Sequence, residues 1–357
     1  MTGIDSQPTR GSGRGRVLTV AKIARLAGVS APTVSRVING QTGVALETRK
    51  RVEAILREHE YRRPAASSSV AILELVFHAL ESLWALEIIR GVEKVAREHD
   101  LAVVLTEMQG RLTPGRAWTE QVLTRRPTGV IAVFSELTVA QQSQLATRSI
   151  PLVVVDPTGE PLHQTPSVGA TNWNGGLAAT RHLLDLGHRR IAMLTGPLQW
   201  PCCRARLDGY RAAMDAAGVP VDPELVRISR LYVEGGLADG RELLDLPDPP
   251  TAIFTTNDLQ AFGVYEAARQ AGVRIPDALS VVGFDDLSFT RWSGPPMTTV
   301  RQPLEQMGAT AARMIIDLAD GQPLEQHRIE LATDLVVRES TAPPRPPGRV
   351  PAPLSAP

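Results

Sequence analysis

Short apolar runs alternate with amphipathic stretches over residues 70–340. The runs read VAILELVF, LAVVLT, GVIAVF, PLVVVD, RIAMLT, TAIFTT and LSVVGF. The stretches between them repeat apolar residues at helical spacing and include Leu86–Glu98, Gly175–Leu186, Arg204–Ala217 and Leu259–Ala271. Wholly apolar strands that alternate with helices predict parallel sheets with both faces covered. Because the region is too long for one small sheet, we expect two similar α/β lobes, with ligand chemistry in the loops after the strand ends.

Residues 18–61 have a different pattern, which predicts short helices joined by a tight turn. Thr19 is suited to cap the first helix, and Gly28 can take the positive φ that ends it. Ser30 is suited to cap the second helix. Pro32 would lie in the first turn of that helix, where no backbone N–H is needed. The pattern therefore predicts a helix-turn-helix.

The second predicted helix has one apolar face and one small, mostly polar face. The apolar face would pack inward and consists of Val34, Val37 and Ile38. The outward face consists of Ala31, Pro32, Thr33, Ser35 and Arg36. A third helix, from about Leu46 to Glu60, would close the core. A helical bundle that binds another protein is the alternative, but the turn chemistry, the small polar face and the positive charge of this segment favour DNA.

The net charge of zero hides an asymmetry along the chain. Residues 1–63 contain 12 Lys and Arg against 5 Asp and Glu, whereas the remainder contains 26 against 33. A basic small segment joined to an acidic larger one fits a head that binds nucleic acid and a body that does not.

The sequence lacks the features of membrane-bound and secreted proteins. No apolar run approaches the roughly 20 residues of a membrane-spanning helix. The N-terminus is polar and basic, with no apolar stretch behind it. We therefore expect a cytoplasmic protein with no membrane partner.

The sequence also predicts that the chain is not an enzyme and needs no cofactor or metal. The GGL at 175–177 lacks the spacing of a phosphate-binding loop, and no nucleophile elbow is present. His188 is expected to be structural. Cys202 and Cys203 are adjacent, so a disulfide between them would be strained, and no His or Cys lies near them at zinc-ligand spacing.

The head closely resembles the DNA-binding head of the lac repressor (LacI/GalR) family. The resemblance runs through TVAKIARLAGVSAPTVSRVING and ETRKRVEAILREHEY. It implies that the second helix lies in the major groove of an operator. Base contacts would come from Ala31, Pro32 and Arg36. Phosphate contacts would come from Thr19, Ser30, Thr33, Ser35, Asn39 and Tyr61. Arg36 can offer paired donors to guanine, which is worth roughly 1–3 kcal/mol of discrimination.

The segment after the head departs from this family. Members usually continue into a hinge helix with an Ala-Arg-x-Leu pattern, whereas this chain reads YRRPAASSSVAILELVF. Three serines favour coil over helix. We therefore favour a short tether at 62–69 over a truncated hinge helix at Ala65–Val70. The basic tail at 1–17 and the Pro-rich tail at 341–357 are predicted to be disordered.

Residues 70–340 also resemble the family's core, which shares the two-lobed fold of periplasmic sugar-binding proteins. The matching phrases include ALEIIRGVEKVAREH, RARLDGYRAAM, TAIFTTNDLQAFGV and LSVVGFDDL. In the family an effector lies between the lobes. The resemblance implies effector contacts from Trp84, in the loop after the first strand, and from Asp156, Arg206, Asn257 and Asp285.

Each of these positions has a structural alternative. Asp156 and Asp285 could instead cap turns or helices, and Trp84 could lie in the core. Two further tryptophans, Trp173 and Trp200, are candidates to stack on a sugar ring. The resemblance also implies that Cys202 faces the cleft.

Together these features predict a homodimeric transcription regulator that binds a palindromic operator and a mono- or oligosaccharide, and they favour a repressor. Some phrases, such as WALEIIRGVE, are similar to actinobacterial regulators of plant-sugar uptake. A regulator that responds to a purine or a protein corepressor is one alternative, and a solute-binding protein is another. No leucine heptad is present in the C-terminal tail, which argues against a coiled-coil tetramer.

Overall fold

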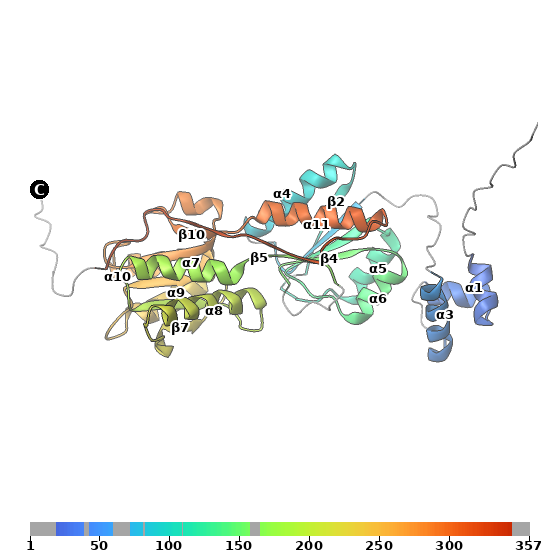
Figure 1. Ribbon diagram of the computed structural model, residues 1–357, viewed down its shortest axis with the longest axis horizontal. Coiled ribbons are helices and arrows are strands. Elements are labelled where there is room, and N and C mark those ends of the chain that lie inside the picture. The colour runs from blue at the N-terminus through green and yellow to red at the C-terminus, as the bar shows by residue number, and fades with distance from the viewer. Residues whose placement is uncertain are drawn as a thin grey trace, which may run out of the picture.

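The chain forms a small helical head and a larger core of two α/β lobes (Figure 1). The computed structural model describes residues 19–38, 43–59, 72–80, 83–108, 110–157 and 165–344. The predicted N-terminal tail, the predicted linker at 62–69 and residues 345–357 of the predicted C-terminal tail lie outside these described residues.

The head is built as the sequence predicts. Its described helices are α1 (Val20–Ala27), α2 (Ala31–Ile38) and α3 (Leu46–Glu58). Thr19 caps α1, because its hydroxyl accepts from the Lys22 N–H at 3.4 Å. Gly28 ends α1 with a φ of 66° and donates its N–H to the helix carbonyls. Ile23, Val34 and Val52 are fully buried and join the three helices in one core.

The N-terminal lobe contains a parallel sheet with strand order β11-β5-β4-β3-β1-β2. Its strands are β1 (Ile72–Phe77), β2 (Ala102–Glu107), β3 (Gly129–Val133), β4 (Leu152–Val155), β5 (Ser167–Ala170) and β11 (Arg328–Leu331). Its helices are α4 (Leu83–Glu98), α5 (Arg116–Arg125), α6 (Val139–Thr147) and α11 (Leu304–Ala319).

The C-terminal lobe repeats this design. The strand order is β12-β10-β9-β8-β6-β7, and within this sheet only the β10–β12 pair is antiparallel among the described strands. Its strands are β6 (Ile191–Thr195), β7 (Val226–Ile228), β8 (Ala252–Thr255), β9 (Ser280–Asp285), β10 (Thr298–Arg301) and β12 (Asp334–Val336). Its helices are α7 (Asn172–Asp185), α8 (Pro201–Ala216), η1 (Pro223–Leu225), α9 (Val233–Leu244), α10 (Asp258–Ala271) and η2 (Ser288–Arg291).

Both sheets carry an apolar core on each face, which confirms the prediction from their wholly apolar strands. In the N-terminal lobe, Leu75 belongs to the core under α4 and α11, whereas Val76 belongs to the core under α5 and α6. In the C-terminal lobe, Met193 and Leu194 divide in the same way between two cores. Alternation of side chains along each strand therefore supplies both faces.

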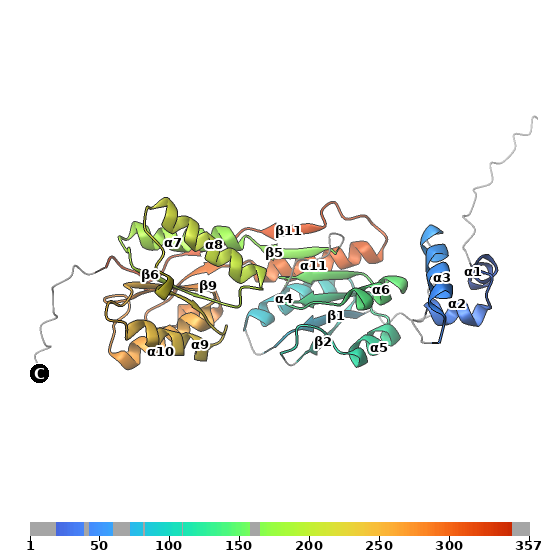
Figure 2. The ribbon, with the colours of Figure 1, turned by 90° about the horizontal axis from the view of Figure 1, so that it is seen from below.

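The described chain passes between the lobes at 170–172, 301–304 and 331–334. Figure 2 shows the lobes side by side with these segments between them. Two of the crossings are joined: the Thr333 N–H donates to Thr171 Oγ1 at 3.0 Å, and the Thr333 hydroxyl donates to the Thr171 carbonyl at 3.2 Å. The third crossing carries Gln302, which is 4% exposed.

The predicted elements need two corrections. Helix α4 begins at Leu83 rather than Leu86, so Trp84 lies in the first turn of α4 and not in the loop after β1. Short strands β5, β7, β10, β11 and β12 were not predicted. Three of these, β7, β11 and β12, contain no fully buried residue.

The C-terminal lobe also extends past the predicted boundary at residue 340. The Ala342 carbonyl accepts from His188 Nε2 at 2.9 Å and from Ser280 Oγ at 3.1 Å. Thr341 Oγ1 lies 2.9 Å from His182 Nε2. His188 also bonds to Ser280 Oγ at 3.0 Å, which confirms the structural role predicted for this histidine.

Candidate DNA-binding and ligand-binding sites

The outward face of α2 carries the residues that were predicted to contact DNA. Ala31, Pro32 and Arg36 are exposed, whereas Thr33 and Ser35 are half-buried. Ser30 caps the helix as predicted, because the Thr33 N–H donates to Ser30 Oγ at 3.3 Å. The opposite face is fixed in the head core by Val34, Val37 and Ile38. The predicted phosphate contacts Asn39 and Tyr61 lie outside the described residues.

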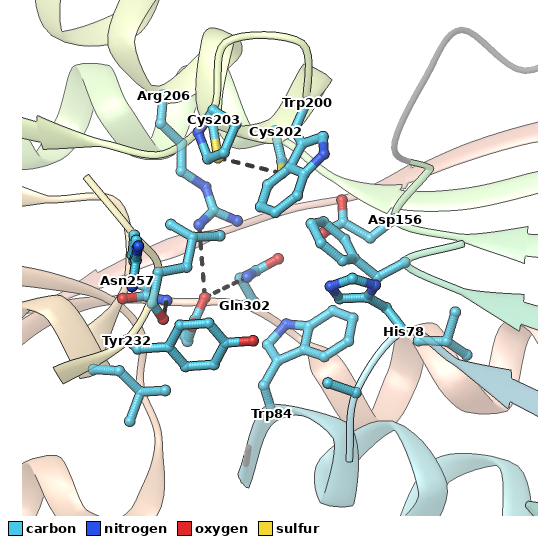
Figure 3. A pocket seen from close by; sticks show the side chains of 18 of the residues that line it. His78, Trp84, Asp156, Trp200, Cys202, Cys203, Arg206, Tyr232, Asn257 and Gln302 are labelled. Carbon is cyan, nitrogen blue, oxygen red and sulfur yellow. Dashed lines mark hydrogen bonds and ion pairs between the residues drawn. The ribbon is translucent and has the colours of Figure 1, made fainter. Parts of the chain in front are cut away.

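A cavity of about 240 Å³ lies between the lobes and is called the interlobe cavity below (Figure 3). Its wall includes all five residues that were predicted to contact an effector. These are Trp84, Asp156, Arg206, Asn257 and Asp285. They come from α4, the end of β4, α8, the start of α10 and the end of β9. The fold therefore brings together residues up to 200 positions apart, at the strand ends where parallel sheets place their sites.

Arg206 is the central cation of the interlobe cavity. It is 4% exposed, and its guanidinium lies 3.7 Å from the centroid of the Phe284 ring. Its Nε donates to Asn172 Oδ1 at 2.8 Å, and its Nη1 donates to the Thr256 carbonyl. The same Nη1 lies 3.8 Å from Asp285 Oδ1. These partners fix the guanidinium so that it faces the cavity.

Gly176 allows α7 to lie close enough to α8 for this arrangement. A Cβ at residue 176 would lie 2.3 Å from the Arg206 carbonyl oxygen, which no real side chain could tolerate. Gly209 has the matching role on α8, because a Cβ there would lie 2.2 Å from the Trp173 carbonyl oxygen. The GGL phrase, which does not fit a phosphate loop, therefore has a packing role.

Two carboxyl groups face Arg206. Asp285 ends β9 with a φ of 119°, and its Oδ1 accepts from Gln302 Nε2 at 2.6 Å. Burial raises the pKa of Asp285 to about 7, and Arg206 opposes this shift. Asp156 follows β4 with a φ of 49°, and burial likewise raises its pKa, again against Arg206. The hydrogen bond that Asp285 accepts comes from the Gln302 side chain and not from a helix N-terminus, which does not fit the helix cap that was one structural alternative for this residue.

Asn257 does serve as such a cap. Its Oδ1 accepts from the Gln260 N–H at 2.8 Å at the start of α10, and its Nδ2 donates to the Leu231 carbonyl at 3.0 Å. Asn257 therefore lines the interlobe cavity with both ends of its amide already bonded.

The rest of the cavity wall is aromatic. The centroid of the Phe134 ring lies 4.8 Å from that of Trp200, 6.2 Å from that of Trp84 and 6.0 Å from that of His78, each in an edge-to-face arrangement. We call these four residues the aromatic wall. Tyr232 lies across from it in Figure 3 and also lines the cavity.

Two of the three tryptophans predicted to contact the effector line the cavity, and one does not. Trp200 lines the interlobe cavity as expected of a stacking residue, and Trp84 packs partly against the N-terminal core as well. Trp173 does not line this cavity and is 42% exposed on α7. The sequence reasoning missed His78 and Phe134, although each directly follows a buried strand, the position at which ligand chemistry was expected.

Two buried polar atoms at the cavity have no partner within the described chain. They are Trp200 Nε1, a donor, and Gln302 Oε1, an acceptor. Buried polar atoms are nearly always bonded, because desolvation without a partner costs roughly 1–3 kcal/mol. A ligand with hydroxyl groups would satisfy both of them.

The described residues contain no cluster of three or more His, Cys, Asp or Glu suited to a metal ion. No helix in the described part of the chain is long and apolar enough to cross a membrane.

Comparison with known proteins agrees with this architecture. Residues 19–64 match the model for bacterial regulatory proteins of the lacI family, and residues 180–341 match a periplasmic binding protein-like domain. The chain is 31% identical to the repressor CytR of Escherichia coli K12, over 90% of this chain and 96% of the relative. It is 33% identical to the ribose operon repressor of the same organism, over 90% of this chain and 99% of the relative.

Solved structures give the same result. A complex of the transcriptional regulator CelR with cellobiose has a TM-score of 0.69 and 33% identity, covering 90% of this chain and 99% of that one. The lac repressor dimer bound to operator and an anti-inducer has a TM-score of 0.66 and 26% identity, covering 92% and 100%. The chain therefore belongs to the lacI family of bacterial regulatory proteins and is a DNA-binding transcription regulator controlled by a ligand.

Proposed function

We propose that the chain is a homodimeric repressor in the cytoplasm whose affinity for a palindromic operator changes when a saccharide binds in the interlobe cavity. The observation that carries the saccharide is the combination of the aromatic wall with charged groups that line the same cavity. Flat aromatic rings stack on the apolar faces of sugar rings, while Arg206, Asp156 and Asp285 bond to hydroxyl groups. The unpartnered atoms Trp200 Nε1 and Gln302 Oε1 add one donor and one acceptor.

The relatives support this class of effector. One similar structure is described as a cellobiose complex, and one similar repressor is named for the ribose operon. A purine, the alternative effector, would offer fewer hydroxyl groups to the charged groups of the cavity. We therefore favour the saccharide.

On the DNA side, the proposed contacts are those of α2 and its caps. Arg36 is the exposed residue of α2 whose side chain can donate two hydrogen bonds to a guanine edge. Thr19, Ser30, Thr33 and Ser35 offer short polar side chains to phosphates around it. Ala31 and Pro32 would contact bases through shape alone.

Exposed aromatic residues on the C-terminal lobe support the homodimer. Phe262 on α10 is 44% exposed, Trp292 is 87% exposed, and the ring of Phe289 lies 5.6 Å from that of Phe262. Exposed clusters of aromatic residues typically mark interfaces. Light scattering on the wild-type chain and on Trp292→Ala tests this, and a monomeric wild type would contradict it.

The test of the saccharide is a thermal-shift screen of the full chain against cellobiose, ribose, other mono- and disaccharides, and purines. Stabilisation by a saccharide, and loss of that stabilisation in Arg206→Ala, is the expected result. Stabilisation by purines alone, or by nothing in the panel, would contradict the proposal.

A further inference from the structure

Two sulfur atoms lie side by side in the wall of the interlobe cavity. Cys202 and Cys203 are the only cysteines of the chain, and both line the cavity in the first turn of α8 (Figure 3). Their Sγ atoms are 4.0 Å apart, and the residues are 5% and 0% exposed. A Cβ at residue 196 would lie 2.6 Å from Cys203 Sγ, so Gly196 leaves the space that this sulfur occupies.

The spacing suits an atom that bridges the sulfurs better than a direct bond between them. A disulfide needs an S–S distance of about 2.05 Å and Cα atoms at least about 4.4 Å apart, but neighbouring Cα atoms are about 3.8 Å apart. Two bonds of about 2.3 Å to one bridging atom that is pyramidal, with an angle slightly above 90° between them, would instead place the sulfurs about 3.4 Å apart. From the observed 4.0 Å a small side-chain rotation reaches that distance, without any movement of the backbone.

The surroundings limit what the bridging atom can be. No cluster of three or more metal-binding side chains exists among the described residues, so the protein supplies two sulfurs and no full metal shell. The bridging atom must therefore carry its own third substituent. Trp200 precedes this turn of α8 and stacks edge-to-face with Phe134 at 4.8 Å, which provides an apolar surface for an organic group.

We propose that Cys202 and Cys203 form a chelating dithiol site for trivalent arsenicals that bear one organic substituent, with the substituent against Trp200 and Phe134. Phenylarsine oxide is the simplest such compound. Two As–S bonds form and the arsenic–oxygen bond breaks. The two thiol protons leave with that oxygen as one water molecule, and arsenic stays trivalent throughout.

The pKa values of the two thiols are shifted in opposite directions, so the thiols take different parts in this step. A hydrogen bond from the Cys202 thiol lowers the pKa of Cys203, against the effect of burial and together with Arg206. The same bond raises the pKa of Cys202, which burial raises further. Cys203 is therefore the thiol that gives up its proton first, to the arsenic-bound oxygen, as its sulfur attacks arsenic, and Cys202 delivers the second proton that completes the departing water.

Occupation of this site has a regulatory consequence, which rests on the proposed function. The dithiol lies in the same cavity as Arg206 and Asp285, so the bound arsenical and a saccharide exclude each other. The chain would then sense dithiol-seeking compounds through the cavity that senses its effector.

The test is intact-mass spectrometry of the full chain with phenylarsine oxide. It compares the wild type with Cys202→Ser, Cys203→Ser and the double variant, with circular dichroism to confirm that each is folded. We expect one arsenical on each wild-type chain, retained against glutathione and removed by dithiothreitol. Each single variant should bind on the order of 100-fold more weakly, because the chelate is lost.

Equal binding by the wild type and the single variants, or no adduct on the wild type, would overturn the dithiol site. The same reaction is then run with the saccharide found in the thermal-shift screen. If the bound saccharide slows the addition of phenylarsine oxide to the wild-type chain, the dithiol lies in the effector cavity. If the bound saccharide does not slow it, that placement is wrong. If no saccharide binds at all, the proposed function fails, but the mass measurement still shows whether Cys202 and Cys203 bind the arsenical.

Discussion

Gln302 Nε2 donates a hydrogen bond of 2.6 Å to Asp285 Oδ1, and this bond joins a crossing between the lobes to the wall of the interlobe cavity. Asp285 is in turn 3.8 Å from Arg206. A ligand that bonds to either group therefore acts on a segment that must move when the lobes rotate. Since hinge residues commonly lie in such crossings, this bond gives the ligand a direct way to bias the lobe arrangement.

Arg206→Ala should remove effector binding. The substitution deletes a buried cation that faces the cavity and leaves Asp156 and Asp285 without it. Hydrogen bonds to a charged group are worth about 2 kcal/mol each, so saccharide affinity should fall by roughly 30-fold or more in calorimetry. Arg204→Ala is the matched control, because Arg204 lies on the same helix and is exposed. Equal losses in both variants would show that the effect is not specific to the cavity.

Trp200→Phe should weaken saccharide binding moderately. The change keeps an aromatic ring but removes the unpartnered Nε1 donor. A loss of about 1 kcal/mol, or roughly fivefold in affinity, is expected for one neutral hydrogen bond. Trp173→Phe is the control, since Trp173 does not line the cavity. Unchanged affinity in Trp200→Phe would mean that no ligand group accepts from this indole.

Asp285 should give the chain a measurable pH dependence of stability. Its pKa is raised to about 7 in the folded chain, against ~3.9 in an unfolded one. Between these values the folded state holds the proton more tightly, so this contribution to stability is largest below about pH 4 and is lost as pH rises through 7.

Urea unfolding from pH 5.5 to 8 should therefore show a steeper loss of stability in the wild type than in Asp285→Asn. Burial lowers the pKa values of His182 and His188, so these residues make stability rise with pH. Both proteins contain them, so their contribution cancels when the two free energies of unfolding are subtracted. Asp215→Asn, at an exposed position, should behave like the wild type. Parallel curves for wild type and Asp285→Asn would contradict the assignment.

Gly176→Ala should destabilise the C-terminal lobe and displace Arg206. The added methyl would lie 2.3 Å from the Arg206 carbonyl oxygen, so α7 and α8 must separate. Overpacking of this kind costs about 1–3 kcal/mol, which thermal or urea unfolding would detect. Gly169→Ala is the control, because its methyl would meet nothing within 4 Å. Wild-type stability and saccharide affinity in Gly176→Ala would refute the packing role.

Arg36→Ala should abolish specific operator binding. An operator is first selected from random duplexes with the wild-type chain, and binding is then measured by anisotropy at fixed salt. Arg57→Ala on α3, also an exposed arginine of the head, controls for the loss of one positive charge. A variant at Arg36 that still footprints normally on the selected operator would contradict the assignment of Arg36 as the base-reading residue.

The sequence predicted the strands that stand out as runs of apolar residues. Strand β3 is wholly apolar, and β1 is apolar except for the buried Glu74, because both faces of the sheet are covered. Strand β11 was missed because its side chains alternate between exposed and half-buried at a sheet edge. Composition alone does not separate such a short edge strand from a loop.

The site was predictable only in part. Arg206 and Asp285 were identified through the resemblance to the lac repressor family, which supplied the role of each matched position. The aromatic wall was not identified as a unit, since Trp84 and Trp200 come from different lobes and meet through Phe134. Contacts of this kind depend on how the lobes pack, which local sequence patterns do not encode.

The central claim is that a ligand in the interlobe cavity controls operator binding by the head. The most direct measurement is an operator-binding isotherm for the full chain, with and without the saccharide that stabilises it, for the wild type and Arg206→Ala. The saccharide should change wild-type operator affinity by roughly 5- to 150-fold and leave Arg206→Ala unchanged. A saccharide that binds the wild type in the cavity but leaves its operator affinity unchanged would contradict the account.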